Sequence, residues 1–477
     1  MSDIRALLKS RATVRSQTPS SSTQLPQSTM STIVALSTPR GRGALAVIRL
    51  SGSDTISIAR QMSGLDLIEA RQATLVTLRR PQDNETLDQV LLTCFPAPHS
   101  LTGEDVVEIS CHGSPAVVRN IIDTTLKLGA MLAGPGEFTL RALSNGKINL
   151  AQAEAIRDLI AAQTDAAVKQ ASRQLNGELS NALGPFKEKL LEVIVLLESA
   201  LEFVEEDIPA PRANEIDNDL VAVATGVEKL ARSYGAGRLI QEGIRVTITG
   251  RPNVGKSSLF NSLMEHERAI VTDIPGTTRD TLSEAIDLDG IPVILTDTAG
   301  LRETTDGIET LGIERTRRAM SDADLVLVVL DGSDELGPSD RQLLDQTATT
   351  RRLVVMNKSD LPGFSVSSSC IDELQPINVS AHTGEGLVAL RTAILASLNS
   401  NGIEEGGLLI TNARHYDLLC STQRELESAR TALSERYSEE LVLVPLHNAL
   451  KFLGQITGET TTEDILSEIF ATFCIGK

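Results

Sequence analysis

Hydrophobic and polar positions divide the chain into segments of different periodicity. Short β-rich runs separated by turn residues predict strands at 32–36, 44–50, 74–78, 89–95 and 106–110. A helix-like pattern follows at 116–128. Residues 31–147 are therefore expected to form a compact α+β module.

From residue 148 to 240 the pattern changes to helical spacing. It predicts helices over 150–175, 186–203 and 216–234, with a break at Gly184-Pro185. Residues 241–400 alternate strand-like and helix-like patterns, which is typical of a mostly parallel sheet. The helical pattern returns after the Gly-rich stretch 401–407 and continues to the end of the chain.

Two helical segments thus flank an α/β segment, 148–240 before it and 401–477 after it. One arrangement is an α/β domain inserted into a single helical domain, and the other is two separate helical bundles. Each helical half is only marginally large enough to form a core alone, which favours insertion. The predicted fold class is multidomain, with an α/β domain at 241–400 inserted in an all-helical domain and an α+β domain before them.

Residues 1–30 are rich in Ser, Thr, Gln and Pro, a composition that cannot bury a core. We interpret them as a disordered extension or a start placed too far upstream, because Met30 precedes the first strand-like run. The alternative is an organellar transit peptide, since the segment is basic and Ser-rich. That alternative would place the protein in mitochondria or plastids rather than the cytoplasm.

Composition narrows the class of protein. Of the 477 residues, 41% are hydrophobic and 22% charged, and no apolar run is long enough for a membrane span. Five scattered cysteines without a CxxC pair argue against a disulfide framework or zinc ribbon and favour a reducing compartment. The net charge of −19 excludes the strongly basic nucleic-acid binders, so any RNA is expected to be held weakly through local patches.

A phosphate-binding motif lies at the start of the α/β segment. The strand-like run 244–249 leads directly into G-x-x-x-x-G-K-S at 250–257, and a helix-like run follows. Glycines allow backbone N–H groups to converge on phosphate oxygens, and the helix N-terminus adds favourable partial charge. Lys256 is expected to contact the β- and γ-phosphates, and Ser257 to bind Mg²⁺.

Four further elements follow in order. The first is Gly276-Thr277-Thr278, where a loop can offer a Thr hydroxyl to the metal, and the second is Asp297-Thr298-Ala299-Gly300 after a strand. The third, Asn357-Lys358-Ser359-Asp360, ends another strand, and its Asp can accept both N–H donors of guanine. Ser380-Ala381-His382 fits a backbone contact to guanine O6. This order predicts a GTPase.

Hydrolysis also requires a group that orients water. Leu301 follows the Asp297 motif, so no glutamine is available there. Nearby carboxylates are those of Glu303, Asp306, Glu309 and Glu314, and composition alone does not choose among them.

From residue 31 to its end, the chain resembles the bacterial and organellar tRNA-modification GTPase family MnmE, also called TrmE. The resemblance rests on the guanine motifs and on the stretches STPRGRG at 37–43, IRLSG at 48–52, LTGEDVVE at 101–108, GPGEFTLRA at 134–142 and FCIGK at 473–477.

The resemblance implies an N-terminal domain that dimerises and binds a tetrahydrofolate one-carbon donor, 5-formyl- or methylene-tetrahydrofolate. It implies a homodimer that acts with an FAD-containing partner on C5 of the wobble uridine (position 34) of certain tRNAs. Addition of an aminomethyl or carboxymethylaminomethyl group is the reaction implied. K⁺ would stand where other GTPases place an arginine finger, in G domains that associate across the dimer.

Carried over by motif, Glu309 matches the water-orienting residue. Asn253, Thr272, Ile274 and Thr277 match the K⁺ ligands, and Ser257 and Thr278 match the Mg²⁺ ligands. Arg49, Glu108, Lys147 and, more loosely, Lys477 match the folate-binding positions. The positions expected to contact GTP are Asn253, Val254, Gly255, Lys256, Ser257, Ser258, Thr272, Asp273, Ile274, Pro275, Gly276, Thr277, Thr278, Asp297, Thr298, Ala299, Gly300, Asn357, Lys358, Asp360, Ser380, Ala381 and His382.

Two alternatives stay open. A ribosome-assembly or signalling GTPase would share the G domain but would have no use for the folate-like residues. Cys474 either lies near the modification chemistry or is a buried structural thiol. Cys111-His112 lacks a partner at metal-ligand spacing and is expected to line or support the folate pocket.

Overall fold

The computed structural model describes residues 31–202, 210–266, 268–270, 283–297, 320–364, 374–397, 407–460 and 462–476. Internal contacts divide the chain into two compact units. The first contains residues 1–148 together with 466–477, and the second contains 149–465. None of the helices that the structure describes is both long and apolar enough to cross a membrane.

The first unit is built on a six-stranded sheet in the order β3-β4-β5-β2-β1-β6, and all its strand pairs are antiparallel except β1 with β6. Its elements are β1 (Ile33–Leu36), β2 (Leu45–Ser51), α2 (Thr55–Ser63), β3 (Thr74–Arg79), β4 (Thr86–Phe95), β5 (Val106–His112), α3 (Pro115–Lys127), β6 (Met131–Leu132) and α4 (Glu137–Ser144). The predicted strands and the predicted helix at 116–128 are confirmed to within a few residues.

Alternation along β2 and β5 gives the sheet one buried face. Ile48 and Leu50 of β2 and Ile109 of β5 share a core with α2 and α3. The intervening residues, including Arg49 and Glu108, lie on the opposite face because successive side chains of a strand point to opposite sides. Polar functional groups in this unit are therefore kept apart from its core.

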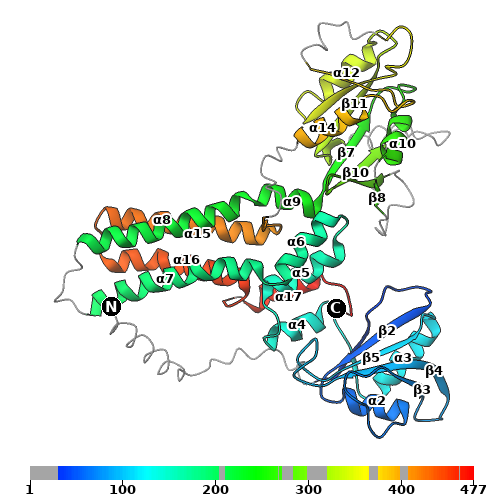
Figure 1. Cartoon of the computed structure of the whole chain (residues 1–477), viewed down its shortest axis with the longest axis vertical. Coiled ribbons are helices and arrows are strands. Elements are labelled where there is room, and N and C mark those ends of the chain that lie inside the picture. Colours follow the sequence, from blue (N-terminus) through cyan, green and yellow to red (C-terminus); the bar gives the residue numbers. More distant parts are fainter. Residues whose placement is uncertain are drawn as a thin grey trace. The chain divides into compact units, whose positions relative to one another are not determined.

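The second unit contains helices from both helical segments of the sequence. They are α5 (Leu150–Ala161), α6 (Asp165–Leu175), α7 (Glu178–Glu202), α8 (Ala210–Arg232), α9 (Tyr234–Glu242), α15 (Ala413–Ser434), α16 (Glu439–Thr457) and α17 (Glu463–Ala471), the last of which continues into the first unit. Helices α7, α8, α15 and α16 run side by side (Figure 1).

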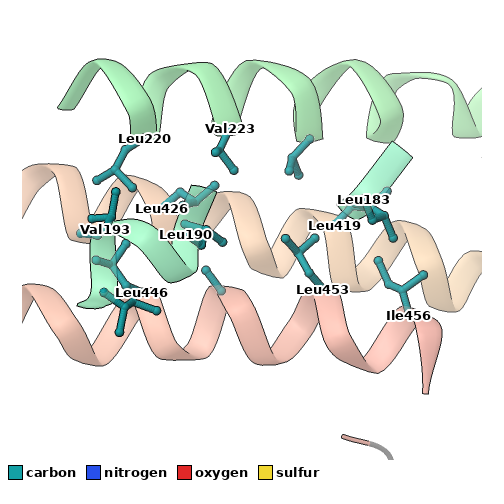
Figure 2. Packing of buried hydrophobic residues seen from close by; sticks show 14 of the residues in the cluster. Leu183, Leu190, Val193, Leu220, Val223, Leu419, Leu426, Leu446, Leu453 and Ile456 are labelled. Atoms are coloured by element: carbon teal, nitrogen blue, oxygen red, sulfur yellow. The ribbon is translucent and has the colours of Figure 1, made fainter. Parts of the chain in front are cut away.

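These four helices share one hydrophobic core. Figure 2 shows Leu220 of the first segment beside Leu426 of the second, and Leu183 of the first beside Leu419 of the second, and all four side chains are fully buried. Burial of each leucine contributes about 1.5–3 kcal/mol. Because the two helical segments form one core, the α/β segment is inserted between them, and the alternative of two separate bundles is wrong.

Two expected helix boundaries are also wrong. Gly184-Pro185 does not end or begin a helix, since α7 runs through Pro185 and buries Leu179 and Leu183 before it. A proline inside a helix removes one N–H hydrogen bond and crowds the carbonyl four residues before it, and the burial of these leucines offsets that cost. The predicted helix 150–175 is two helices, because Thr164 has an extended backbone and accepts a hydrogen bond from Ala167 N to start α6.

The inserted segment forms a seven-stranded sheet in the order β13-β12-β11-β7-β10-β9-β8. Its elements are β7 (Ile244–Thr249), α10 (Lys256–His266), β8 (Arg268–Ile270), β9 (Ser283–Leu288), β10 (Ile291–Asp297), β11 (Leu325–Asp331), α12 (Pro338–Gln346), β12 (Arg352–Asn357), β13 (Ile377–Asn378) and α14 (Leu387–Ser397). Strands β10, β7, β11, β12 and β13 are parallel, so their carboxyl ends meet at one edge. That edge carries the predicted GTPase motifs.

Candidate functional site

The loop between β7 and α10 has the backbone that phosphate binding requires. Asn253 and Gly255 both have left-handed φ values, +66° and +94°. A Cβ at Gly255 would lie 2.2 Å from Asn357 Nδ2, so only glycine fits there. Lys256 is the first residue of α10, and its Nζ donates to the Arg251 carbonyl 2.9 Å away across the loop.

Ser257 and Asp297 meet at the carboxyl edge of the sheet. The Ser257 hydroxyl donates to Asp297 Oδ2 at 2.7 Å, and Asp297 is almost fully buried at the end of β10. A hydroxyl and a carboxylate are the hard oxygen ligands that Mg²⁺ prefers. The oxygen atoms of these two residues are therefore of the kind that suits a magnesium ion.

The guanine motif lies on neighbouring strands of the same sheet. Asn357 at the end of β12 donates to the Val254 carbonyl at 2.8 Å and accepts from Ala381 N at 3.0 Å. Its side chain therefore connects the phosphate loop to the segment 380–382. Ser380 donates its hydroxyl to Asp360 Oδ1 at 2.6 Å, and this bond lowers the pKa of Asp360, which leaves the carboxylate ionised and oriented at neutral pH.

Several predicted residues lie outside the described residues. They are Glu309, Thr272, Asp273, Ile274, Pro275, Gly276, Thr277, Thr278, Thr298, Ala299, Gly300 and Lys477. Val254 lies within the phosphate loop and is fully buried, Ser258 lies in the first turn of α10, and His382 lies in a turn after β13.

In the first unit, Arg49 and Glu108 are directly opposite each other on β2 and β5. The guanidinium donates to Glu108 Oε1 through Nε at 2.9 Å and Nη2 at 2.7 Å. Arg49 also lies 5.8 Å from the ring centroid of the buried Phe138. The structure thus joins two of the four predicted folate residues in one ion pair, which remains partly accessible.

Lys147 lies against the loop that contains Gly103. A Cβ at Gly103 would be 3.2 Å from Lys147 Cε, and φ there is +81°. Asn145 holds the same loop by donating to the Thr102 carbonyl at 2.7 Å. Lys147 is therefore positioned by a loop whose conformation requires glycine.

Sequence reasoning missed the buried ion pairs that support this loop. Arg141 of α4 is 3% exposed and donates to Glu104 Oε2 at 3.0 Å and Glu137 Oε1 at 2.8 Å. Glu104 in turn accepts from Ser51, two residues after Arg49 on β2. Both Glu104 and Arg141 are in the quoted family stretches, but nothing in their spacing indicates that they meet.

The last residues of the chain pack within the first unit. Ile475 forms an isolated antiparallel bridge with Pro135, and Ser37 donates to the Gly476 carbonyl at 3.0 Å. Cys474 is exposed, so the alternative of a buried structural thiol is wrong. The segment places an accessible thiol on the first unit.

Cys111 and His112 point to opposite faces of β5. Cys111 is buried in the core, and burial raises its pKa to about 11, so it is no nucleophile at neutral pH. His112 is exposed, and its Nδ1 is 2.8 Å from Asp88 Oδ1. The two residues therefore do not act as a pair.

Comparison with known proteins agrees with this architecture. Residues 150–474 match the family model of the MnmE helical domain, and residues 32–147 match the model described as GTP-binding protein TrmE N-terminus. The chain is 45% identical over 452 residues to the tRNA modification GTPase MnmE of Koribacter versatilis, covering 94% of this chain and 99% of that one.

The corresponding protein of Aquifex aeolicus is 41% identical over 447 residues, with 93% and 99% covered. Among solved structures, the G domain of the T. maritima FeoB iron transporter is 26% identical over 32% of this chain and 98% of its own, with a TM-score of 0.26. The identity over nearly the full length of both curated relatives shows that the chain belongs to the MnmE family of tRNA modification GTPases.

Proposed function

We propose that this GTPase modifies tRNA, coupling GTP hydrolysis to the addition of an aminomethyl or carboxymethylaminomethyl group at C5 of the wobble uridine. The observation that carries the proposal is the combination, in one chain of this family, of a guanine-nucleotide site with an Arg49–Glu108 pair in a separate unit. A GTPase that only switches between two states needs the first site and has no use for the second.

The phosphate loop supplies the hydrolytic part of the reaction. Lys256 would place its charge on the β- and γ-phosphates, and Ser257 with Thr278 would hold Mg²⁺, which neutralises charge on the phosphates. The contact from Asn357 to Val254 keeps the phosphate loop in register with the guanine loop. The nucleotide is thus held at both ends before the chemical step.

Glu309 is proposed to orient the attacking water. Glu309→Ala should lower kcat for GTP hydrolysis about 100-fold, because general-base and water-positioning groups contribute at least that much. The dissociation constant of a fluorescent GTP analogue should stay within twofold of wild type. Glu314→Ala, which removes another nearby carboxylate, is the matched control and should hydrolyse GTP normally. Weakened nucleotide binding in Glu309→Ala would instead assign the residue a structural role.

Asn253, with Thr272, Ile274 and Thr277, is proposed to bind K⁺ beside the phosphates. GTP hydrolysis should then be about 10-fold faster in K⁺ than in Na⁺ at equal ionic strength, because a positioned cation stabilises charge in the transition state. Asn253→Ala should abolish the difference.

Asn253 has a left-handed backbone, so alanine also adds strain there. Asn253→Gly accepts that backbone and likewise lacks the amide oxygen, so it too should respond equally to both cations. If the glycine variant still hydrolyses GTP faster in K⁺ than in Na⁺, the loss of this difference in Asn253→Ala comes from backbone strain. Asn253 would then not bind K⁺.

Arg49, Glu108, Lys147 and Lys477 are proposed to bind the tetrahydrofolate donor. Basic groups suit the carboxylates of its glutamate tail, and a carboxylate suits the N–H donors of its pterin. The Arg49–Glu108 pair supplies both kinds of group on the accessible face of the sheet. Cys474 is exposed on the same unit and is available to the modification chemistry.

We propose that a second copy of the chain covers this face. Leu75 pairs with Leu91 across β3 and β4, and both are exposed, as is Leu45 at the start of β2. Exposed leucines on the face of a sheet mark a protein interface, and the same face carries Arg49 and Glu108. Folate binding and dimerisation would therefore involve the same surface.

An FAD-containing protein is the proposed partner in the redox part of the reaction. This chain has a net charge of −19, which repels the tRNA phosphates on average. The partner is accordingly proposed to supply much of the basic surface that holds the tRNA.

Mass spectrometry of the wobble nucleoside tests the function. tRNA from cells that lack this protein should contain wobble uridine without the C5 group, and the wild-type chain should restore it. Arg49→Ala should hydrolyse GTP normally yet fail to restore the modification. If tRNA from cells without the protein carries the same C5 modification as wild-type tRNA, the protein would instead be a GTPase switch that does no modification chemistry.

A further inference from the structure

The lysine of the guanine motif has an unexpected partner. Asp331, the last residue of β11, is opposite Asn357 in the parallel pairing of β11 with β12. Lys358, the next residue, has a left-handed backbone with φ of +69°, which is uncommon for a residue other than glycine. Its Nζ lies 2.6 Å from Asp331 Oδ2.

The Asp331 carboxylate is itself held firmly. Its Oδ1 accepts from Ser333 through the backbone N at 3.0 Å and the hydroxyl at 2.6 Å, and its side chain is 11% exposed. Burial raises its pKa, but the hydrogen bonds from Lys358 and Ser333 outweigh this and lower it below the usual range. Asp331 is therefore charged at neutral pH and cannot turn away from Lys358 without losing three hydrogen bonds.

The chain around the pair is also tied to the guanine loop. Gly332 N donates to the Asn357 carbonyl at 2.9 Å, and Ser359 N donates to the Val379 carbonyl at 3.1 Å. Asn357 and Asp360, the expected guanine contacts, are the immediate neighbours of these anchored residues. A fixed Lys358 side chain thus restricts the backbone that carries both of them.

We propose that Asp331 is a positioning residue for guanine recognition, which it achieves by holding Lys358 and so setting the backbone between Asn357 and Asp360. This role goes beyond the guanine contacts themselves and rests on the proposed assignment of Asp360 to the base. Asp331 acts through Lys358 and does not touch the nucleotide.

Asp331→Asn removes the charge and keeps the shape of the side chain. We expect the Kd of GDP and of GTP to rise equally, about 10-fold, because a charge-assisted hydrogen bond is replaced by a neutral one. The kcat at saturating GTP should stay within twofold of wild type. The ratio of the Kd for IDP to that for GDP should fall, since IDP lacks the 2-amino group that a well-placed Asp360 detects.

Asp345→Asn is the matched control, because it removes an exposed carboxylate from the following helix α12. It should leave the Kd of GDP and of GTP, the kcat, and the ratio of the Kd for IDP to that for GDP unchanged. If Asp331→Asn unfolds, Ser333→Ala is the second variant. That variant removes one hydroxyl bond to Asp331 and should raise the Kd of GDP two- to threefold with the same fall in the IDP ratio.

An unchanged Kd in folded Asp331→Asn, or a lower kcat with unchanged Kd, would overturn the proposal. A weaker Kd with an unaltered IDP ratio would also overturn it, because general loosening of the domain affects all nucleotides alike. The preference of the wild-type protein for GDP over ADP tests the guanine site separately, so failure of that site is distinguishable from failure of the Asp331 role.

Discussion

Asp360→Asn is expected to weaken GDP and GTP binding about a thousandfold and to create a preference for xanthine nucleotides. The guanine ring presents two N–H donors to the carboxylate, one from N1 and one from the 2-amino group. An asparagine amide offers one acceptor and one donor, so its NH₂ group would face the 2-amino group of guanine. Xanthine has a carbonyl oxygen at that position, which the NH₂ group can donate to.

The geometry makes this a specific test. Asp360 is oriented by the Ser380 hydroxyl at 2.6 Å, and Ser380 is fully buried, so the asparagine side chain is expected to occupy the same place. Competition between a fluorescent GDP analogue and unlabelled GDP or XDP measures both affinities. Ser380→Ala is the matched control. It removes the orienting bond without changing the donor pattern, and should weaken GDP binding without any gain for XDP.

A switch from GDP to XDP in Asp360→Asn would support contact between this residue and the base. Equal loss of GDP and XDP binding with a lowered unfolding temperature would indicate that Asp360 only maintains the loop. Unchanged GDP binding would remove the residue from the site.

Glu154→Gln is expected to destabilise the helical part of the chain by about 3 kcal/mol. Glu154 of α5 is 1% exposed, and it accepts from Arg414 through Nε at 2.9 Å and Nη2 at 2.7 Å. The Nε2 atom of the buried His415 lies 2.7 Å from Glu154 Oε2. Glutamine would leave the Arg414 charge in a buried site without its carboxylate partner.

This cluster connects helices from both halves of the helical part. Besides Glu154 of α5, Arg414 of α15 donates to the carbonyl oxygens of Gln455 and Ile456 at the end of α16. The substitution should therefore lower hydrogen-exchange protection in α5, α15 and the last turn of α16 together. Mass spectrometry of exchanging peptides in increasing urea measures that local stability.

The effect has a defined pH dependence. Burial raises the pKa of Glu154, but the charges and hydrogen bonds of His415 and Arg414 outweigh it and lower the pKa from 4.5 to about 2. A carboxylate with a lowered pKa in the folded state stabilises that state above its unfolded pKa. The Glu154 carboxylate should therefore contribute about 3 kcal/mol to the free energy of unfolding. This contribution should be complete above pH 4.5 and disappear as the pH falls towards 2.

The difference between wild type and Glu154→Gln should shrink over the same range. Glu198→Gln is the matched control, because Glu198 lies 3.3 Å from His447 in an exposed Glu–His pair of the same unit. This substitution should lower the free energy of unfolding by less than about 1 kcal/mol. Equal effects of the two substitutions, or a difference that is constant from pH 5 to pH 2.5, would contradict the assignment.

Much of the GTPase site could be predicted because its residues are contiguous. The phosphate loop follows β7, and Asn357 ends β12, and strand ends of a parallel sheet meet at one edge. Ser257 and Asp297 likewise belong to motifs that follow strands of this sheet, and the structure places the two side chains in contact. The Lys358–Asp331 pair was missed because nothing in the motif spacing shows that a left-handed Lys358 turns its side chain towards β11.

Local patterns in the chain were enough to predict the order of the elements, the apolar face of most of them and the loops in which GTP chemistry is expected. Periodicity and glycine-rich motifs are local properties, so they can be read without knowing the fold. The folded chain was needed to show that the two helical segments share one core, that α7 continues through Pro185, and that Glu154 meets His415, 261 residues further along the chain. Such pairings depend on how distant surfaces pack, and long charged side chains have no pattern of their own that specifies a partner.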